Sequence, residues 1–118
     1  MRIVGVDPGK ISGVALRIDD EMLGSEEAKT LSSLWHLLHA YYPDVLVVEE
    51  FVGGFRWRSR NANDPIKAIG VCELYANLSG IKLVKSNPSK LQTRKQRPRG
   101  MSLHEWSAQV HALGYKEK

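Results

Sequence analysis

Hydrophobic residues along the chain fall into short runs that alternate with turns and with longer amphipathic segments. Residues 2–7 form an apolar run that ends on an acid, and residues 12–19 alternate well enough to pair with it as a hairpin across the turn PGKIS. Residues 21–28 have a weaker pattern and predict a short third strand. Residues 45–50 begin with four consecutive apolar residues, which is typical of a central strand covered on both faces.

Three other segments have the spacing of helices. Residues 30–42 carry apolar side chains three and four positions apart, with Thr30 as the N-cap. Residues 64–79 open on Asp-Pro, with the Asp as the N-cap, and are followed by a glycine that ends the helix. A short strand over 81–86 and a last helix over 102–115 complete the order. A hairpin followed by alternating helices and strands predicts an α/β fold, with a mixed sheet flanked by helices.

Composition narrows the class of protein. The chain has 118 residues, of which 42% are hydrophobic and 25% charged, so we expect residues 1–118 to form a single domain with one modest core. We expect no membrane span, because no apolar run approaches the ~20 residues that a span requires. The start of the chain lacks the pattern of a secretory signal, and one cysteine, Cys72, excludes an intramolecular disulfide. These features favour a cytoplasmic protein.

Charge is divided unevenly along the chain. Residues 1–50 contain nine acids and four bases, whereas residues 51–118 contain thirteen bases and four acids. Such a division predicts a polyanionic partner for the basic part, and the alternative is an ordinary solvated surface. In FRWRSR, alternation places the arginines on one side of an extended loop, where they can contact phosphates while an aromatic residue stacks on a base. The predicted DNA contacts are Arg56, Arg58, Arg60, Lys85, Lys90, Arg94, Lys95, Arg97 and Arg99.

Two carboxylates follow apolar strands. Asp7 ends the first strand and Glu49 follows the run at 45–48, so both lie at the same sheet edge if these strands are parallel neighbours. Two close carboxylates do not both ionise unless a cation lies between them, and Mg²⁺ prefers such oxygen ligands. The alternative is that each acid ends its strand and meets solvent. Gly9 and Gly13 allow a tight turn after Asp7 and a close approach of the backbone to a phosphate.

Several motifs, taken in order, resemble one known family. They are GVDPGKISGVAL, VLVVEEFV, a helix ending in ANLSG, IKLVKSNPSKLQ and HEWSAQVHALGY. Together they cover nearly the whole chain and resemble the RuvC-type Holliday-junction resolvases, most closely their compact phage-type relatives.

The resemblance implies a ribonuclease-H-like fold and a homodimer that cuts branched DNA. It assigns metal binding and catalysis to Asp7, Glu49 and His104, with one or two Mg²⁺ or Mn²⁺ ions as cofactor. Hydrolysis would be in line, leaving a 5′ phosphate and a 3′ hydroxyl. The apolar helix 64–79 is the implied dimer face, although full burial within one chain explains its composition as well. His111, on the same helical face as His104, is expected to pack in the core.

The sequence departs from the family pattern at one position. Where the family has an acid three residues after His104, this chain has Ser107. Three explanations remain: Glu105 or Glu50 substitutes for the acid, fewer protein ligands give a slow enzyme, or the protein recognises junctions without cutting them.

Two other classes of protein are alternatives to a RuvC-type resolvase. A compact YqgF-like nuclease acting on structured RNA is the second alternative. Actin-like and sugar-kinase proteins also open on a strand followed by D-x-G, but they need two lobes and several hundred residues.

Overall fold

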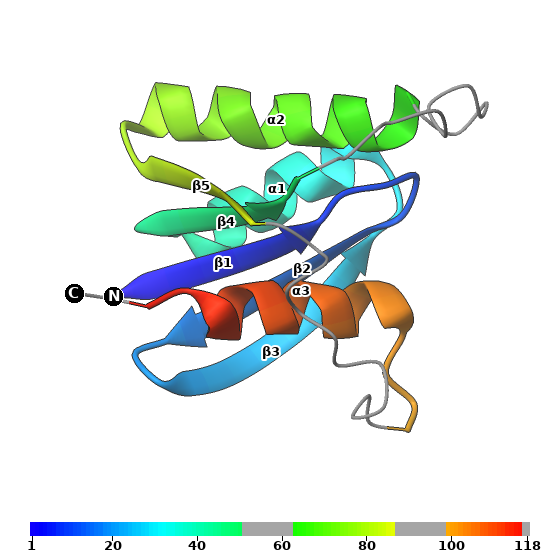
Figure 1. The fold of residues 1–118 in the computed structure, drawn as a ribbon. Helices are drawn as coiled ribbons and strands as arrows, with labels where there is room; N and C mark the ends of the chain where they lie inside the picture. The colour runs from blue at the N-terminus through cyan, green and yellow to red at the C-terminus, as the bar shows by residue number, and fades with distance from the viewer. Residues whose placement is uncertain (51–62, 87–98, 117–118) are drawn as a thin grey trace.

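A five-stranded mixed sheet forms the centre of the molecule (Figure 1). The structure, a computed structural model, describes residues 1–50, 63–86 and 99–116. The strand order is β3-β2-β1-β4-β5. Strands β1, β2 and β3 pair antiparallel, whereas β1–β4 and β4–β5 are parallel. The strands are β1 (Arg2–Asp7), β2 (Ser12–Ile18), β3 (Glu21–Ala28), β4 (Val45–Glu49) and β5 (Lys82–Ser86).

Helices cover both faces of this sheet. In Figure 1, α1 (Leu31–Tyr41) and α2 (Asn63–Ser79) lie on one face, and α3 (Leu103–Gly114) crosses the other. The larger core lies under α1 and α2, where side chains such as Leu34 and Cys72 pack on the strands. A smaller core lies under α3, where Ala112 packs on the opposite side. The predicted mixed sheet with flanking helices is therefore confirmed.

Helix starts follow the predicted capping residues in two cases. The Thr30 hydroxyl accepts a hydrogen bond from the Ser33 amide at 3.0 Å, and the Ser102 hydroxyl accepts one from the Glu105 amide at 3.1 Å. Helix α2 differs, because it begins at Asn63 and Asp64 lies in its first turn. The prediction of Asp64 as N-cap, with Pro65 as the first helical residue, thus placed the start two residues too late, within the range over which helix ends vary.

Helix α3 lies unusually close to the sheet because two strand glycines face it. A Cβ added at Gly13 would lie 1.9 Å from the carbonyl oxygen of His104, and one at Gly5 would lie 2.2 Å from that of Ala108. This corrects the prediction that Gly13 opens the backbone to a phosphate, because its face is occupied by the first turn of α3. Gly9 does lie in the predicted turn after Asp7, where its amide and carbonyl both contact the Ser12 hydroxyl at 3.3 Å.

The far end of α3 is tied to β2 by a buried arginine. The Arg17 guanidinium donates to the carbonyl of Ala112 at 2.9 Å and to that of Tyr115 at 2.6 Å. These bonds satisfy carbonyls that the end of a helix leaves unpaired. Both ends of α3 are therefore fixed against the sheet.

Among the described helices, none combines the length and the apolar composition needed to cross a bilayer.

Candidate active site

The two predicted carboxylates meet at one edge of the sheet. Strands β1 and β4 are parallel and in register from Ile3–Val45 to Val6–Val48, so Asp7 and Glu49 follow the last paired residues side by side. The two carboxyl groups lie close enough for each to shift the pKa of the other. Both side chains are mostly buried, with exposed fractions of 17% for Asp7 and 23% for Glu49. The prediction that these acids converge is confirmed.

Burial and neighbouring groups shift the pKa values of Asp7 and Glu49 in opposite directions. Burial raises the pKa of Asp7 to about 9, and Glu49 adds to this through its hydrogen bond and its charge, against a lowering by the Ser107 hydroxyl. Burial also acts to raise the pKa of Glu49, but hydrogen bonds from His111, Asp7 and Ser107 outweigh it, so that the pKa is lowered. The pair therefore shares one proton at neutral pH, held on Asp7.

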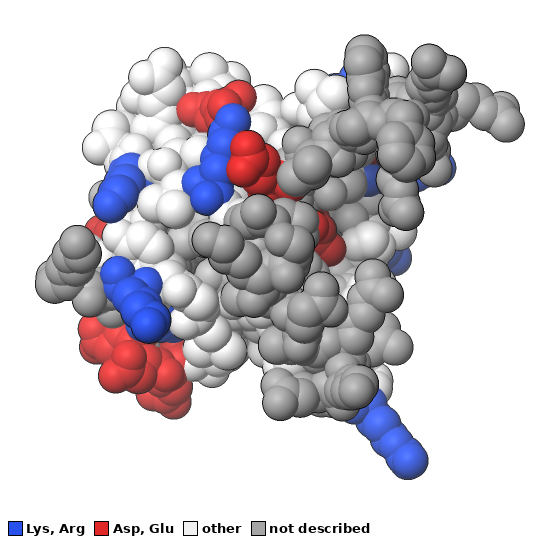
Figure 2. All heavy atoms as spheres, viewed as in Figure 1, with Lys and Arg blue, Asp and Glu red and all other residues white. Residues whose placement is uncertain are grey.

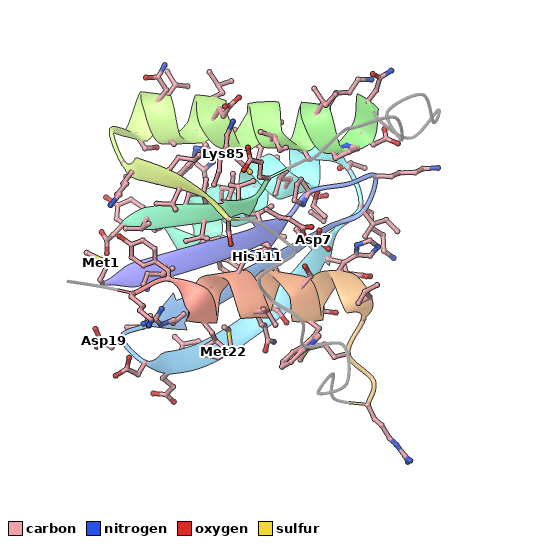
Figure 3. The ribbon with its side chains drawn as sticks, viewed as in Figure 1. Met1, Asp7, Asp19, Met22, Lys85 and His111 are labelled. Carbon is pink, nitrogen blue, oxygen red and sulfur yellow. The ribbon has the colours of Figure 1, made fainter. Side chains whose placement is uncertain are left out.

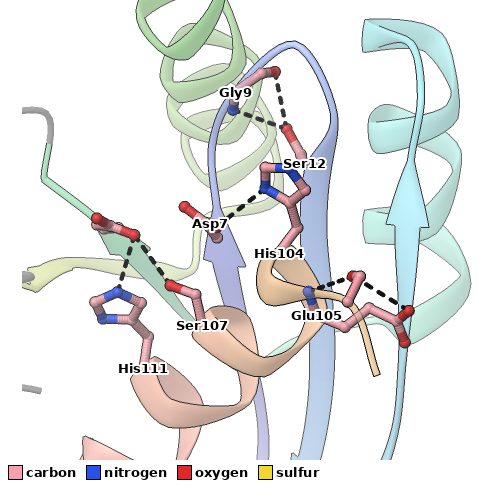
Figure 4. Close-up of polar contacts among 9 residues, drawn as sticks. Asp7, Gly9, Ser12, His104, Glu105, Ser107 and His111 are labelled. Carbon is pink, nitrogen blue, oxygen red and sulfur yellow. Dashed lines mark hydrogen bonds and ion pairs between the residues drawn. The ribbon is translucent and has the colours of Figure 1, made fainter. Parts of the chain in front are cut away.

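Helix α3 places polar side chains over this pair (Figure 4). His104, which is 43% exposed, lies with Nδ1 3.4 Å from Oδ2 of Asp7. Ser107, one turn further along, donates its hydroxyl to Oε2 of Glu49 at 3.2 Å. Residues three apart share a helical face, so one face of α3 serves both carboxylates.

His111 contacts the site, whereas the sequence predicted only packing for it. It is buried as expected, with 2% of its side chain exposed, but its Nε2 lies 3.2 Å from Oε2 of Glu49. Its Nδ1 lies 2.9 Å from the hydroxyl of Ser86, which ends β5 beside Glu49. The signal was present in the sequence: Ser107 and His111 are four residues apart, and Ser86 ends a strand as the two acids do.

The acids considered as replacements for a missing fourth ligand lie elsewhere. The Glu105 carboxylate accepts hydrogen bonds from Ser25 at 2.9 Å and from Ser102 at 3.5 Å, on the β3 side of α3. Glu50 is exposed, and its amide donates to the Ser86 carbonyl at 2.8 Å. Glu105 is thus already engaged by hydroxyl donors away from the Asp7–Glu49 pair.

The donor set at this edge has the chemistry of a site for a hard cation with few protein ligands. Two adjacent carboxylates match the pattern in which Mg²⁺ uses one or two carboxylates and keeps several waters for a phosphate substrate. His104 contacts Asp7 but does not complete a triad. Within residues 1–50, 63–86 and 99–116, no three His, Cys, Asp or Glu side chains are placed to hold an ion together.

Most of the predicted DNA contacts lie outside the described residues. These are Arg56, Arg58, Arg60, Lys90, Arg94, Lys95 and Arg97. Arg99 is exposed. Lys85 is exposed as well, and its ammonium forms an ion pair with Glu73 of α2 at 3.3 Å, so part of its charge is already balanced (Figure 3).

Acidic residues gather at the opposite end of the sheet. Asp19, Asp20 and Glu21 form the exposed β2–β3 turn, which lies at the lower left of Figure 2. Figure 3 places Asp19 beside Met1, far along the sheet from Asp7. The N-terminal ammonium of Met1 and Oδ1 of Asp19 form an ion pair at 3.2 Å.

Comparisons with known proteins show which solved structures have a similar fold. No protein-family model matches the sequence, and no curated protein is similar to it. Thermus thermophilus RuvC in complex with a Holliday junction substrate is similar in structure, with a TM-score of 0.77 and 19% identity over 96% of this chain and 90% of that one. A second structure of T. thermophilus RuvC has a TM-score of 0.71 and 17% identity over 96% and 92% of the two chains.

A viral enzyme is similar over less of its length. For the fowlpox virus Holliday junction resolvase the TM-score is 0.56 and the identity 24%, over 75% of this chain and 62% of that one. The strand order, the helices on both faces and these similarities together give the chain the ribonuclease-H-like fold of the RuvC-type Holliday junction resolvases.

Proposed function

We propose that the protein is a metal-dependent endonuclease that cleaves branched DNA of the Holliday-junction type. The observation that carries the proposal is the mostly buried Asp7–Glu49 pair at the edge of a sheet with the RuvC fold. Two proteins of similar structure, T. thermophilus RuvC and a fowlpox virus resolvase, have been solved in complex with Holliday junctions.

Asp7 and Glu49 would hold Mg²⁺ or Mn²⁺, with His104 beside Asp7 as a further nitrogen donor. Such an ion, held by these residues, would supply Lewis acidity for the hydrolysis of a phosphodiester by water. Ser107 and His111 both contact Oε2 of Glu49, so they fix its orientation and favour its ionised form. Asp7 must lose its proton to bind the ion, so cation affinity rises with pH.

Ser107 supports a second candidate, a junction-binding protein without turnover. A neutral hydroxyl stands where the resemblance leads us to expect an acid, and the described residues contain no third carboxylate beside Asp7 and Glu49. The two candidates differ in one measurable property, the rate of strand cleavage.

Replacing Ser107 by Asp is expected to increase the nicking of a labelled four-way junction in Mn²⁺ by roughly an order of magnitude or more. The new carboxylate would lie against Glu49 and add a third anionic ligand. Ser107→Asn is the matched control, because it has a similar size but no charge. Nicking by the wild type and faster nicking by Ser107→Asp support the nuclease, whereas an inert wild type with an active Ser107→Asp establishes the binding protein. A competition between the junction and structured RNA tests the RNA alternative in the same assay.

Helix α2 supports a homodimer, which symmetrical cutting of a four-way junction requires. Ile66, Leu74 and Leu78 are 50%, 52% and 70% exposed, and they recur at multiples of four residues along one face. Gly70 lies between them, and a Cβ there would meet nothing within 4 Å, so a second helix can approach closely.

Leu74→Arg is therefore expected to convert a dimer to a monomer in analytical ultracentrifugation and to replace paired cuts by single nicks. Leu23→Arg is the matched control, because Leu23 on β3 is also 52% exposed but lies away from α2. A wild-type protein that sediments as a monomer at micromolar concentration, with or without junction DNA, argues against this interface.

A further inference from the structure

A basic cavity lies beside the active-site edge but on the other face of the sheet from α3. Its volume is about 220 Å³. Gly9 and Lys10 of the β1–β2 turn line it, together with Lys29 and Lys67 from the start of α1 and of α2. In Figure 1 these three segments lie together at the right-hand end of the molecule. Gly9 is two residues from Asp7, so the cavity adjoins the carboxylate pair without using its residues.

Among the residues that the structure describes, no acid forms an ion pair with the lysines of this cavity. Lys10, Lys29 and Lys67 are all exposed, and none forms an ion pair with another described residue. Asp64 is the acid in the lining, and it lies in the first turn of α2, where the helix dipole already stabilises a negative charge. Three like charges converging on one cavity repel one another unless an anion lies between them.

The start of α1 adds to the positive potential. Thr30, the N-cap, also lines the cavity, so the positive end of the α1 dipole is directed at the same space as the three ammonium groups. The cavity combines point charges on three long side chains with the positive end of a helix dipole, a combination that favours phosphate oxygens.

We propose that this cavity binds a backbone phosphate of the DNA substrate, other than the one that is cleaved. The proposal rests on the proposed function for the identity of the polyanion. A strand whose scissile phosphate lies at Asp7 would pass Gly9 and reach the cavity on the α1–α2 face, so the two sites would grip the strand on both sides of the sheet edge. The same phosphate chemistry occurs in free phosphate, and the test separates the two sources.

The test measures junction binding against salt for two double variants. Lys29→Gln with Lys67→Gln removes two charges from the cavity, and Lys82→Gln with Lys116→Gln removes two exposed charges from the opposite end of the sheet. Affinity for a fluorescent four-way junction is measured in EDTA over a range of KCl concentrations. Each phosphate contact contributes about 0.9 to the slope of log K against log salt. We expect the cavity variant to reduce the magnitude of the slope by about one unit, the contribution of one phosphate, and the control variant to change it little.

Equal slopes for the two double variants would overturn the proposal, because they would show only the effect of net charge. A titration with inorganic phosphate, followed by amide NMR shifts at Gly9 and Lys10, tests the other source. Strong lysine-dependent shifts with no change in the junction slope would identify a site for free phosphate and overturn the assignment to DNA. Nicking by the wild type is scored separately. If the wild type does not nick but the cavity variant lowers the salt slope, the proposed nuclease activity is contradicted and the phosphate site is supported. If the wild type nicks but the cavity variant leaves the slope unchanged, the nuclease is supported and the phosphate site is contradicted.

Discussion

Replacing Asp7 by Asn is expected to abolish junction cleavage while making the metal-free protein more stable. Asn keeps the shape and can donate to Glu49 as protonated Asp7 does, but it removes the charge that binds a cation. Loss of that charge is expected to lower the rate by roughly a thousandfold or more. The free energy of unfolding should rise by about 1–2 kcal/mol at pH 8, because the mutant no longer buries a carboxyl group that must stay protonated. Single-turnover nicking in Mn²⁺ and urea denaturation in EDTA measure the two effects.

The stability difference between the wild type and Asp7→Asn is expected to depend on pH. The pKa of Asp7 rises from 3.8 to about 9 on folding, so between these values the folded protein holds a proton that the unfolded chain has released. The free energy of unfolding attributable to Asp7 is therefore highest below pH 4 and falls as the pH rises towards 9. Subtracting the Asp7→Asn curve from the wild-type curve isolates this term. A difference that is flat across this range, or a mutant less stable than the wild type at pH 8, counts against the paired carboxylates.

A methyl group at Gly13 is expected to damage both stability and catalysis. The added Cβ would lie 1.9 Å from the His104 carbonyl oxygen and 2.9 Å from the Glu105 amide nitrogen, both backbone atoms of α3. Backbone cannot move aside as a flexible side chain does, so the first turn of α3 must lift from β2. We expect Gly13→Ala to cost about 3–5 kcal/mol of unfolding free energy. In protein that still folds, a shift of His104 and Ser107 by about 1 Å should slow nicking by roughly a hundredfold.

Gly24→Ala is the control for this effect. Gly24 also lies in a strand, β3, but a Cβ there would meet nothing within 4 Å. Its stability should stay within about 0.5 kcal/mol of the wild type. Urea denaturation and nicking rates are measured for both variants. Equal stability and equal nicking rates would show that the position of α3 does not depend on the absence of a side chain at Gly13.

The order of elements was predictable from local patterns alone. The unbroken apolar run at 45–48 predicted a strand covered on both faces, and all four residues are buried. Thr30 and Ser102 predicted helix starts because their hydroxyls satisfy amides of the first turn. Asp64 predicted the start of α2 less well, because the helix begins at Asn63, ahead of the Asp-Pro pair.

The active site was predictable only in part. Asp7 and Glu49 were found because both follow apolar strands, and parallel pairing brings strand ends together. The roles of His111 and Gly13 depend on how α3 lies across the sheet. The four-residue spacing places His111 on the same helical face as Ser107, but only the tertiary structure shows that this face meets Glu49. The packing predicted for His111 was therefore correct about its burial but missed its contact with Glu49.

Counting the protons released when Mn²⁺ binds tests most directly whether Asp7 and Glu49 exchange their shared proton for a divalent cation. Calorimetric titration at pH 7, in buffers of different ionisation enthalpy, gives this number. We expect release of about one proton per ion bound by the wild type, because Asp7 is protonated before binding and ionised after it. Binding without proton release, or equally tight binding by Asp7→Asn, would contradict it.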